Sequence, residues 1–147
     1  MSTVTRESVP GAVRLSRALL IAVAVSHLVV PLVLWANESA LRAQIAERYP
    51  GFGEAEVARS ASVAIESGAV FHGILLVLCV VPVWKLATGR TWTRRLITAT
   101  QVLSLVFSVF SWTSSPMFHV VIPVVGLVQV VLVALLWVPR PARDFFA

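Results

Sequence analysis

Cysteine, lysine and charged residues of either sign are scarce in this sequence. Cys79 is the only cysteine among 147 residues and lies inside an apolar run, which excludes an intrachain disulfide and any Cys-x-x-Cys metal or redox site. Only 13% of the residues are charged, about half the share usual in soluble domains. Eleven arginines stand against one lysine, a bias that together with abundant Ala and Val is typical of a GC-rich bacterial genome.

Sequence motifs of common enzymes are missing as well. The chain contains no GxSxG, Walker loop, GxGxxG or HExxH pattern, so soluble hydrolase and nucleotide chemistry have no support. The sequence leaves open whether the protein is an enzyme but favours a non-enzymatic role, and no motif requires a cofactor. The net charge of +5 does not indicate a nucleic-acid partner. The basic residues flank apolar runs instead of forming a stripe, which favours topology signals and contact with anionic lipids.

Hydrophobic residues make up 58% of the chain and gather in four long runs. A membrane-spanning helix needs about 20 mostly apolar residues, so we predict spans at about residues 18–35, 61–86, 96–114 and 117–138. The first run is longer than the apolar core of a signal peptide and no clean cleavage motif follows it, so we expect it to be retained. The fold class expected is all-α, a single domain built as an antiparallel four-helix transmembrane bundle.

The only sizeable loop, residues 36–60, separates the first two predicted spans. Residues 39–49 predict a short amphipathic helix because Leu41, Ile45 and Tyr49 fall on one helical face. A Pro-Gly-Phe-Gly segment then breaks the chain, and a helix is expected to restart near residue 54 and run into the second span.

The distribution of basic residues predicts the orientation in the membrane. Nine of the twelve Lys and Arg residues lie in the N-terminal segment, in the 85–95 connection and in the C-terminal tail, and three lie in the 36–60 loop. By the positive-inside rule both termini face the cytoplasm, so the amphipathic helix is expected on the opposite, extracytoplasmic side. We predict a multi-pass protein of the cytoplasmic (inner) membrane of a bacterium.

Small polar side chains form a seam along the third predicted span. The spacing of 3, 4, 3 and 4 residues places them on one helical face, where they allow close packing and hydrogen bonds to a neighbouring helix. This polar seam comprises Gln101, Ser104, Ser108, Ser111 and Ser115. The fourth span offers a matching face with His119, Ile122, Gly126 and Gln129, so we expect these two helices to pack as a hairpin. The seam is either a packing face or a polar pathway between helices.

Few ionisable groups fall at membrane depth. Counting about 1.5 Å per residue from the span midpoints places His27 near the bilayer centre and His72 about 3 Å outward. Glu66 and His119 both fall roughly 12–14 Å outward. His27 and His72 are therefore candidates for a packing contact, for proton transfer, or for joint ligation of a metal ion or haem b. Glu66 is either a residue of the outer head-group region or a buried carboxylate with His119 as its partner.

Prolines inside the spans add one further pattern. Pro31, Pro82 and Pro123 each remove a backbone donor and free the carbonyl four residues earlier. Two of those carbonyls belong to His27 and His119, so the segments 27–31 and 119–123 read alike. The likeness is explained either by an inverted repeat or by coincidence.

The C-terminal sequence carries a resemblance. Leu135-Leu-Trp-Val-Pro139 followed by Arg143-Asp-Phe-Phe146 resembles the ending of small actinobacterial four-helix integral membrane proteins, a group that implies no activity. Size and helix number are also similar to those of small multidrug transporters. Those proteins carry a membrane glutamate in their first helix, whereas here the first span holds His27 and the acid is Glu66 in the second.

Three functions remain open from the sequence. The first is an accessory or interaction subunit, with the bilayer and other membrane proteins or further copies of itself as partners. The second is a small transporter or ligand-binding bundle. It would use Glu66, His72, His119, Gln101 and Gln129. The third is a membrane redox or metal protein with His27 and His72 as ligands.

Overall fold

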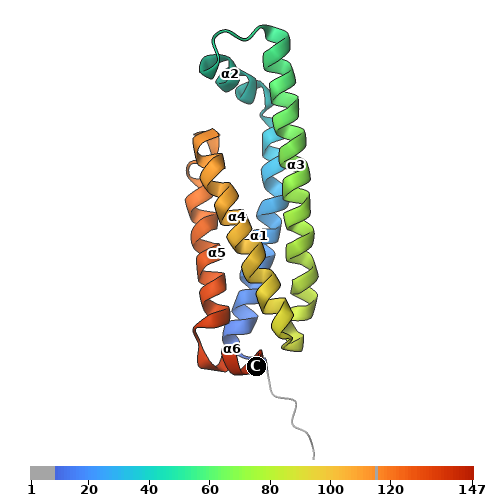
Figure 1. Cartoon of the computed structure of the whole chain (residues 1–147), viewed down its shortest axis with the longest axis vertical. Coiled ribbons are helices and arrows are strands. Elements are labelled where there is room, and N and C mark those ends of the chain that lie inside the picture. The colour runs from blue at the N-terminus through green and yellow to red at the C-terminus, as the bar shows by residue number, and fades with distance from the viewer. Residues whose placement is uncertain (1–8, 115) are drawn as a thin grey trace, which may run out of the picture. The chain divides into compact units, whose positions relative to one another are not determined.

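A computed structural model describes residues 9–114 and 116–147, and this part of the chain is almost entirely helical, without a β-strand. The helices follow one another as α1 (Gly11–Ala36), α2 (Glu38–Arg48), α3 (Glu54–Lys85), η1 (Leu86–Thr88), α4 (Thr91–Ser114), η2 (Pro116–Phe118), α5 (Val121–Trp137) and α6 (Arg140–Phe145), where η denotes a 3-10 helix (Figure 1).

Three of these helices are long and apolar enough to cross a bilayer: α1, α3 extended through η1, and α4 up to Trp112. Large apolar side chains along them point outward, and Val70 and Trp84 are 65% and 73% exposed. Exposure of so much hydrocarbon to water is unfavourable, whereas contact of the same surface with lipid is not. The chain therefore has the architecture of a helical membrane protein. At 17 residues, α5 is shorter than the other three and lies at the lower limit of a spanning helix.

Two compact units divide the chain, and the division falls within α1 and α3. Unit 1 combines the chain up to Val23 with Leu78–Ala147, and unit 2 is Ala24–Val77. Unit 2 holds the second part of α1, all of α2 and most of α3. In this unit Leu34 lies beside Gly68, where a Cβ would sit 3.5 Å from the leucine methyl, an ordinary contact distance.

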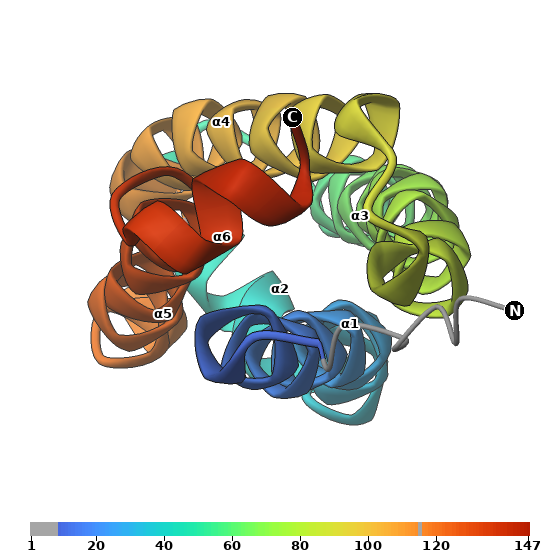
Figure 2. The same ribbon diagram turned by 90° about the horizontal axis from the view of Figure 1, so that it is seen from below.

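In unit 1, α4 and α5 pack side by side, and the short link between them includes η2 (Figure 1). Figure 2 shows α6 running from the end of α5 toward α4. Ala142 and Phe146 in this C-terminal segment are fully buried. The C-terminal segment after α5 is therefore a packed part of unit 1.

Several helix ends differ from the predicted spans, because a span is counted from apolar residues whereas a helix also includes its polar first turns. α1 begins at Gly11, directly after Pro10, whose carbonyl accepts hydrogen bonds from the amides of Val13 and Arg14. α4 begins at Thr91, so Arg94 and Arg95, which the sequence predicts in a connection, lie on a helix.

The sequence predicts Pro123 inside the fourth span, but in the structure this proline does not interrupt a helix. α5 begins at Val121, so Pro123 lies in the first turn, where backbone amides have no intrahelical acceptor anyway. Pro31, in contrast, lies inside α1. The two His-to-Pro segments thus have different structural roles.

Candidate functional site

Unit 2 brings the two predicted mid-membrane histidines together. His27 comes from α1 and His72 from α3, and their Nδ1 atoms lie 3.0 Å apart, a hydrogen-bond distance. The ring centroids are 5.2 Å apart, with the ring planes inclined by 45°. His72 also meets the ring of Phe71 edge-on at 5.7 Å. The pair joins α1 to α3 by a polar contact within unit 2.

Burial favours one tautomer of this pair. His27 is only 4% exposed, and its Nε2 atom has no hydrogen-bond partner among the described residues. His72 is partly exposed, so an N–H at its Nε2 can reach a partner outside the unit. A buried N–H without an acceptor is costly. Burial therefore favours the tautomer in which His27 donates its Nδ1–H to Nδ1 of His72.

A metal ion would have few ligands at this pair. No group of three or more His, Cys, Asp or Glu side chains that could hold a metal occurs among the residues described. Metal–imidazole bonds are about 2.0 Å long, so an ion between the two Nδ1 atoms would lie in a linear site about 4 Å across. The two Nδ1 atoms lie 3.0 Å apart, a hydrogen-bond distance. The present geometry is that of a hydrogen-bonded pair, and ligation of haem b or a metal ion stays a prediction.

One half of the polar seam is bonded between helices in unit 1. Gln101, Ser104 and Gln129 are buried, and the Nε2 amide of Gln129 donates to the hydroxyl oxygen of Ser104 over 2.8 Å. The Nε2 amide of Gln101 donates to Sγ of Cys79 over 3.8 Å, which ties α4 to the end of α3. These amides hold helices together.

One further member of the seam, Ser108, lines an open groove between α4 and α5. The hydroxyl of Ser108 on α4 donates a hydrogen bond to the backbone carbonyl of Ser104 in the same helix. Ser111 is exposed. Gly126 on α5 meets Leu105, with room for a Cβ at 3.5 Å. A groove of about 340 Å³ remains between α4 and α5. Its lining consists of Leu105, Ser108, Val109, Trp112, Ile122, Pro123 and Gly126. Ser115, the last member of the seam, lies outside the described residues.

His119 has a local structural role in unit 1. Its Nε2–H donates to the backbone carbonyl of Trp112 over 2.8 Å, and its ring stacks on that indole at 4.4 Å. The Trp112 carbonyl belongs to the last turn of α4, where carbonyls lack intrahelical partners. His119 therefore caps α4. It lies about 17 Å along α4 from Gln101, too far for one continuous site within this unit.

Glu66 lies on α3 in unit 2, where its side chain is exposed. His119, its predicted partner, belongs to unit 1. The predicted pairing of these two residues therefore stays a prediction.

A cluster around Arg94 was not predicted from the sequence. The Arg94 guanidinium lies over the Trp137 ring at 4.0 Å and over the Phe146 ring at 5.5 Å. Trp137 donates its indole N–H to the hydroxyl of Thr98 over 2.8 Å. Thr91 donates its hydroxyl to the Phe146 carbonyl over 2.8 Å. The cluster fastens the C-terminal segment to α4, and the only sequence signal for it is two phenylalanines in an otherwise polar tail.

Comparison with protein-family models, with curated protein sequences and with solved structures finds no match for this chain.

Proposed function

We propose that this chain is an accessory subunit of a membrane assembly, built as an antiparallel bundle of four transmembrane helices, and that the groove between α4 and α5 receives a partner's transmembrane helix. The partner is another membrane protein or a second copy of the chain. The observation that carries the proposal is the groove itself, which the described part of the chain leaves unfilled.

The composition of the groove supports a helix as its occupant. Small residues at a membrane helix surface let another backbone approach closely, and hydroxyls add hydrogen bonds. Here Gly126 and Ser108 supply the small surface, and the remaining lining is largely apolar. A polar pathway has less support, because the buried amides of Gln101 and Gln129 already bond to neighbouring helices.

The proposed orientation accounts for Glu66 without a transport function. Twenty residues counted back from Lys85 end at Glu66, and about 20 residues span the hydrocarbon core. Glu66 then reaches the outer head-group region, where a carboxylate is hydrated. The positive-inside rule places both termini in the cytoplasm and α2 on the extracytoplasmic side.

Filling the groove tests the proposal. The protein is purified from its native membranes in mild detergent, and the mass of the complex that contains it is measured by native mass spectrometry. We expect a mass above that of the 15.9 kDa chain for the wild type, and dissociation in Gly126→Leu and Ser108→Leu. Val106→Leu is the matched control, because Val106 is exposed on α4 but does not line the groove. A monomeric wild type would overturn the proposal, and so would normal assembly of the Gly126→Leu and Ser108→Leu variants.

A second candidate function, a membrane redox or metal protein, rests on the contact between His27 and His72. Their hydrogen bond shows that two imidazoles share one site in unit 2. An absorption spectrum and metal analysis of the same native preparation test this candidate. A Soret band or a stoichiometric metal that is lost in both His27→Ala and His72→Ala would support it, and a colourless, metal-free sample would remove it.

A further inference from the structure

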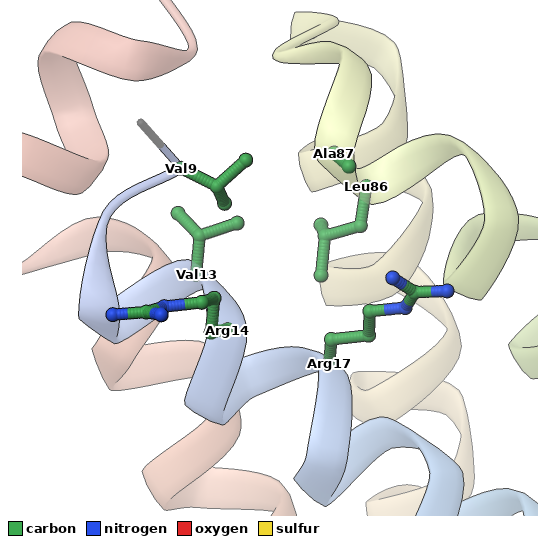
Figure 3. Close-up of a pocket in the computed structure, with 6 residues that line it drawn as sticks. All are labelled: Val9, Val13, Arg14, Arg17, Leu86 and Ala87. Carbon is green, nitrogen blue, oxygen red and sulfur yellow. The ribbon is translucent and has the colours of Figure 1, made fainter. Parts of the chain in front are cut away.

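We propose that unit 1 binds the head group of an anionic phospholipid in a pocket between the start of α1 and η1. Val9, Val13, Arg14 and Arg17 line one side, and Leu86 and Ala87 line the other. Figure 3 shows the side chains of Val13 and Leu86 facing each other across the pocket, with the two arginines beside them. This inference is independent of the proposed assembly.

The pocket combines an apolar wall with a doubly charged edge. Val13 and Leu86 are 1% and 0% exposed, so the wall is fixed, whereas both arginines are exposed. The volume of about 160 Å³ equals that of about five water molecules in the liquid, at about 30 Å³ each. A phosphate-sized group fits such a space.

Charge complementarity identifies the occupant as an anion. Arg14 and Arg17 are three residues apart on one helix, and Figure 3 shows their guanidinium groups on opposite sides of the pocket, so both charges attract an anion bound there. The first turn of α1 contains no acidic residue, and the positive end of its helix dipole adds to the potential there. Among the described residues of unit 1, the single acidic side chain is Asp144, which lies 3.8 Å from Arg140.

Position along the helices favours a lipid over a free anion. The apolar run of α1 starts directly after Arg17, and that of α3 ends directly before Lys85. The pocket thus lies where hydrocarbon gives way to charged residues, which is the level of lipid head groups. Ile21, which is 46% exposed one turn after Arg17 on the same helix, offers a surface for acyl chains. Basic pockets at this level bind anionic head groups.

Lipid binding to the delipidated full-length protein tests the inference, by native mass spectrometry and by thermal unfolding in neutral detergent. We compare phosphatidylglycerol, phosphatidylcholine with the same acyl chains, and inorganic phosphate. Phosphatidylglycerol is expected to bind the protein and to raise its unfolding temperature. Phosphatidylcholine and inorganic phosphate are expected to do neither. The double substitution Arg14→Gln/Arg17→Gln should weaken phosphatidylglycerol binding about 25-fold. Each basic residue near anionic lipid contributes about a fivefold factor in affinity, and two are removed.

Two further variants keep the result interpretable. Arg90→Gln/Arg95→Gln removes the same charge from exposed residues that do not line the pocket, and should bind as the wild type does. Ala87→Glu adds a carboxylate at an exposed lining position and should abolish binding without unfolding the protein. Equal binding of both lipids, equal losses in the two arginine pairs, or stabilisation by inorganic phosphate alone would overturn the inference.

Discussion

Replacing Gly89 with alanine should release the C-terminal helix α6 while leaving the other helices folded. Gly89 has φ +67° and ψ +12°, the left-handed conformation, which costs a residue with a Cβ about 1–2 kcal/mol. An added Cβ would also lie only 2.6 Å from the backbone carbonyl oxygen of Phe145. A backbone atom cannot rotate away, so either the turn at Gly89 or α6 must move.

The contacts that hold the C-terminal segment set the scale of the effect. One hydrogen bond from Thr91 to Phe146 contributes about 1 kcal/mol, and burial of the Phe146 ring about 1.5–3 kcal/mol. The stacked Arg94 guanidinium adds about 0.5–1 kcal/mol. Undocking of α6 relieves the close contact with Phe145, and overpacking of this kind costs about 1–3 kcal/mol. A contact strain of about 2 kcal/mol is a large part of the docking energy, and it raises the undocked fraction about 30-fold.

Trypsin reports the undocked fraction directly. Arg143 lies in α6, and cleavage after it releases Asp144–Ala147, which mass spectrometry detects. Cleavage that is slow relative to opening follows the open population, so Gly89→Ala should lose the tail up to about 30 times faster. Gly73→Ala is the matched control, because no atom lies within 4 Å of its Cβ position and its φ is not positive. Equal cleavage rates in the two variants would refute the reasoning.

Three other predictions concern buried polar contacts and are measured by denaturant unfolding in detergent micelles. Gln129→Leu should cost about 1 kcal/mol because it leaves the Ser104 hydroxyl without its donor. Adding Ser104→Ala should recover most of this loss, and additive losses would contradict the contact. His27→Ala should destabilise more than His72→Ala, since His27 is the more buried partner. The double variant should lose less than the sum of the two, as expected for residues in direct contact. Trp137→Phe should cost about 1 kcal/mol through its lost indole donor, and an unchanged midpoint would contradict that bond.

The helices themselves follow from local sequence. Long apolar runs can only satisfy their backbone groups in lipid as helices, so length and composition locate them. The ends of α3 at Glu54 and Lys85 and the left-handed Gly89 coincide with the turn and charge signals in the sequence. The onset of α1 at Gly11 is less visible, because its first turns are polar and basic and lie outside the apolar run.

The candidate site shows the limit of such local reasoning. Counting residues along each helix placed His27 and His72 at similar depths, which made a contact allowed but did not make it necessary. Whether two side chains on different helices meet depends on helix rotation and axial offset, and apolar faces rich in Val and Leu leave both poorly determined. The hydrogen bond of 3.0 Å therefore comes from the packed structure.

The polar seam makes the same point within one helix. Gln101, Ser104 and Ser108 share a face and a regular spacing, so their sequence pattern predicts one common role. In unit 1 the first two are buried. Gln101 donates a hydrogen bond to Cys79 on α3, and Ser104 accepts one from Gln129 on α5. Ser108 and Gly126 both line the groove, and these two small residues fill little of it. A periodic pattern identifies which side chains face a neighbour, but the size of the residue opposite decides whether the face is filled. A groove that can receive a partner helix arises where small residues oppose each other, so it is a property of two helices and cannot be assigned from either one alone.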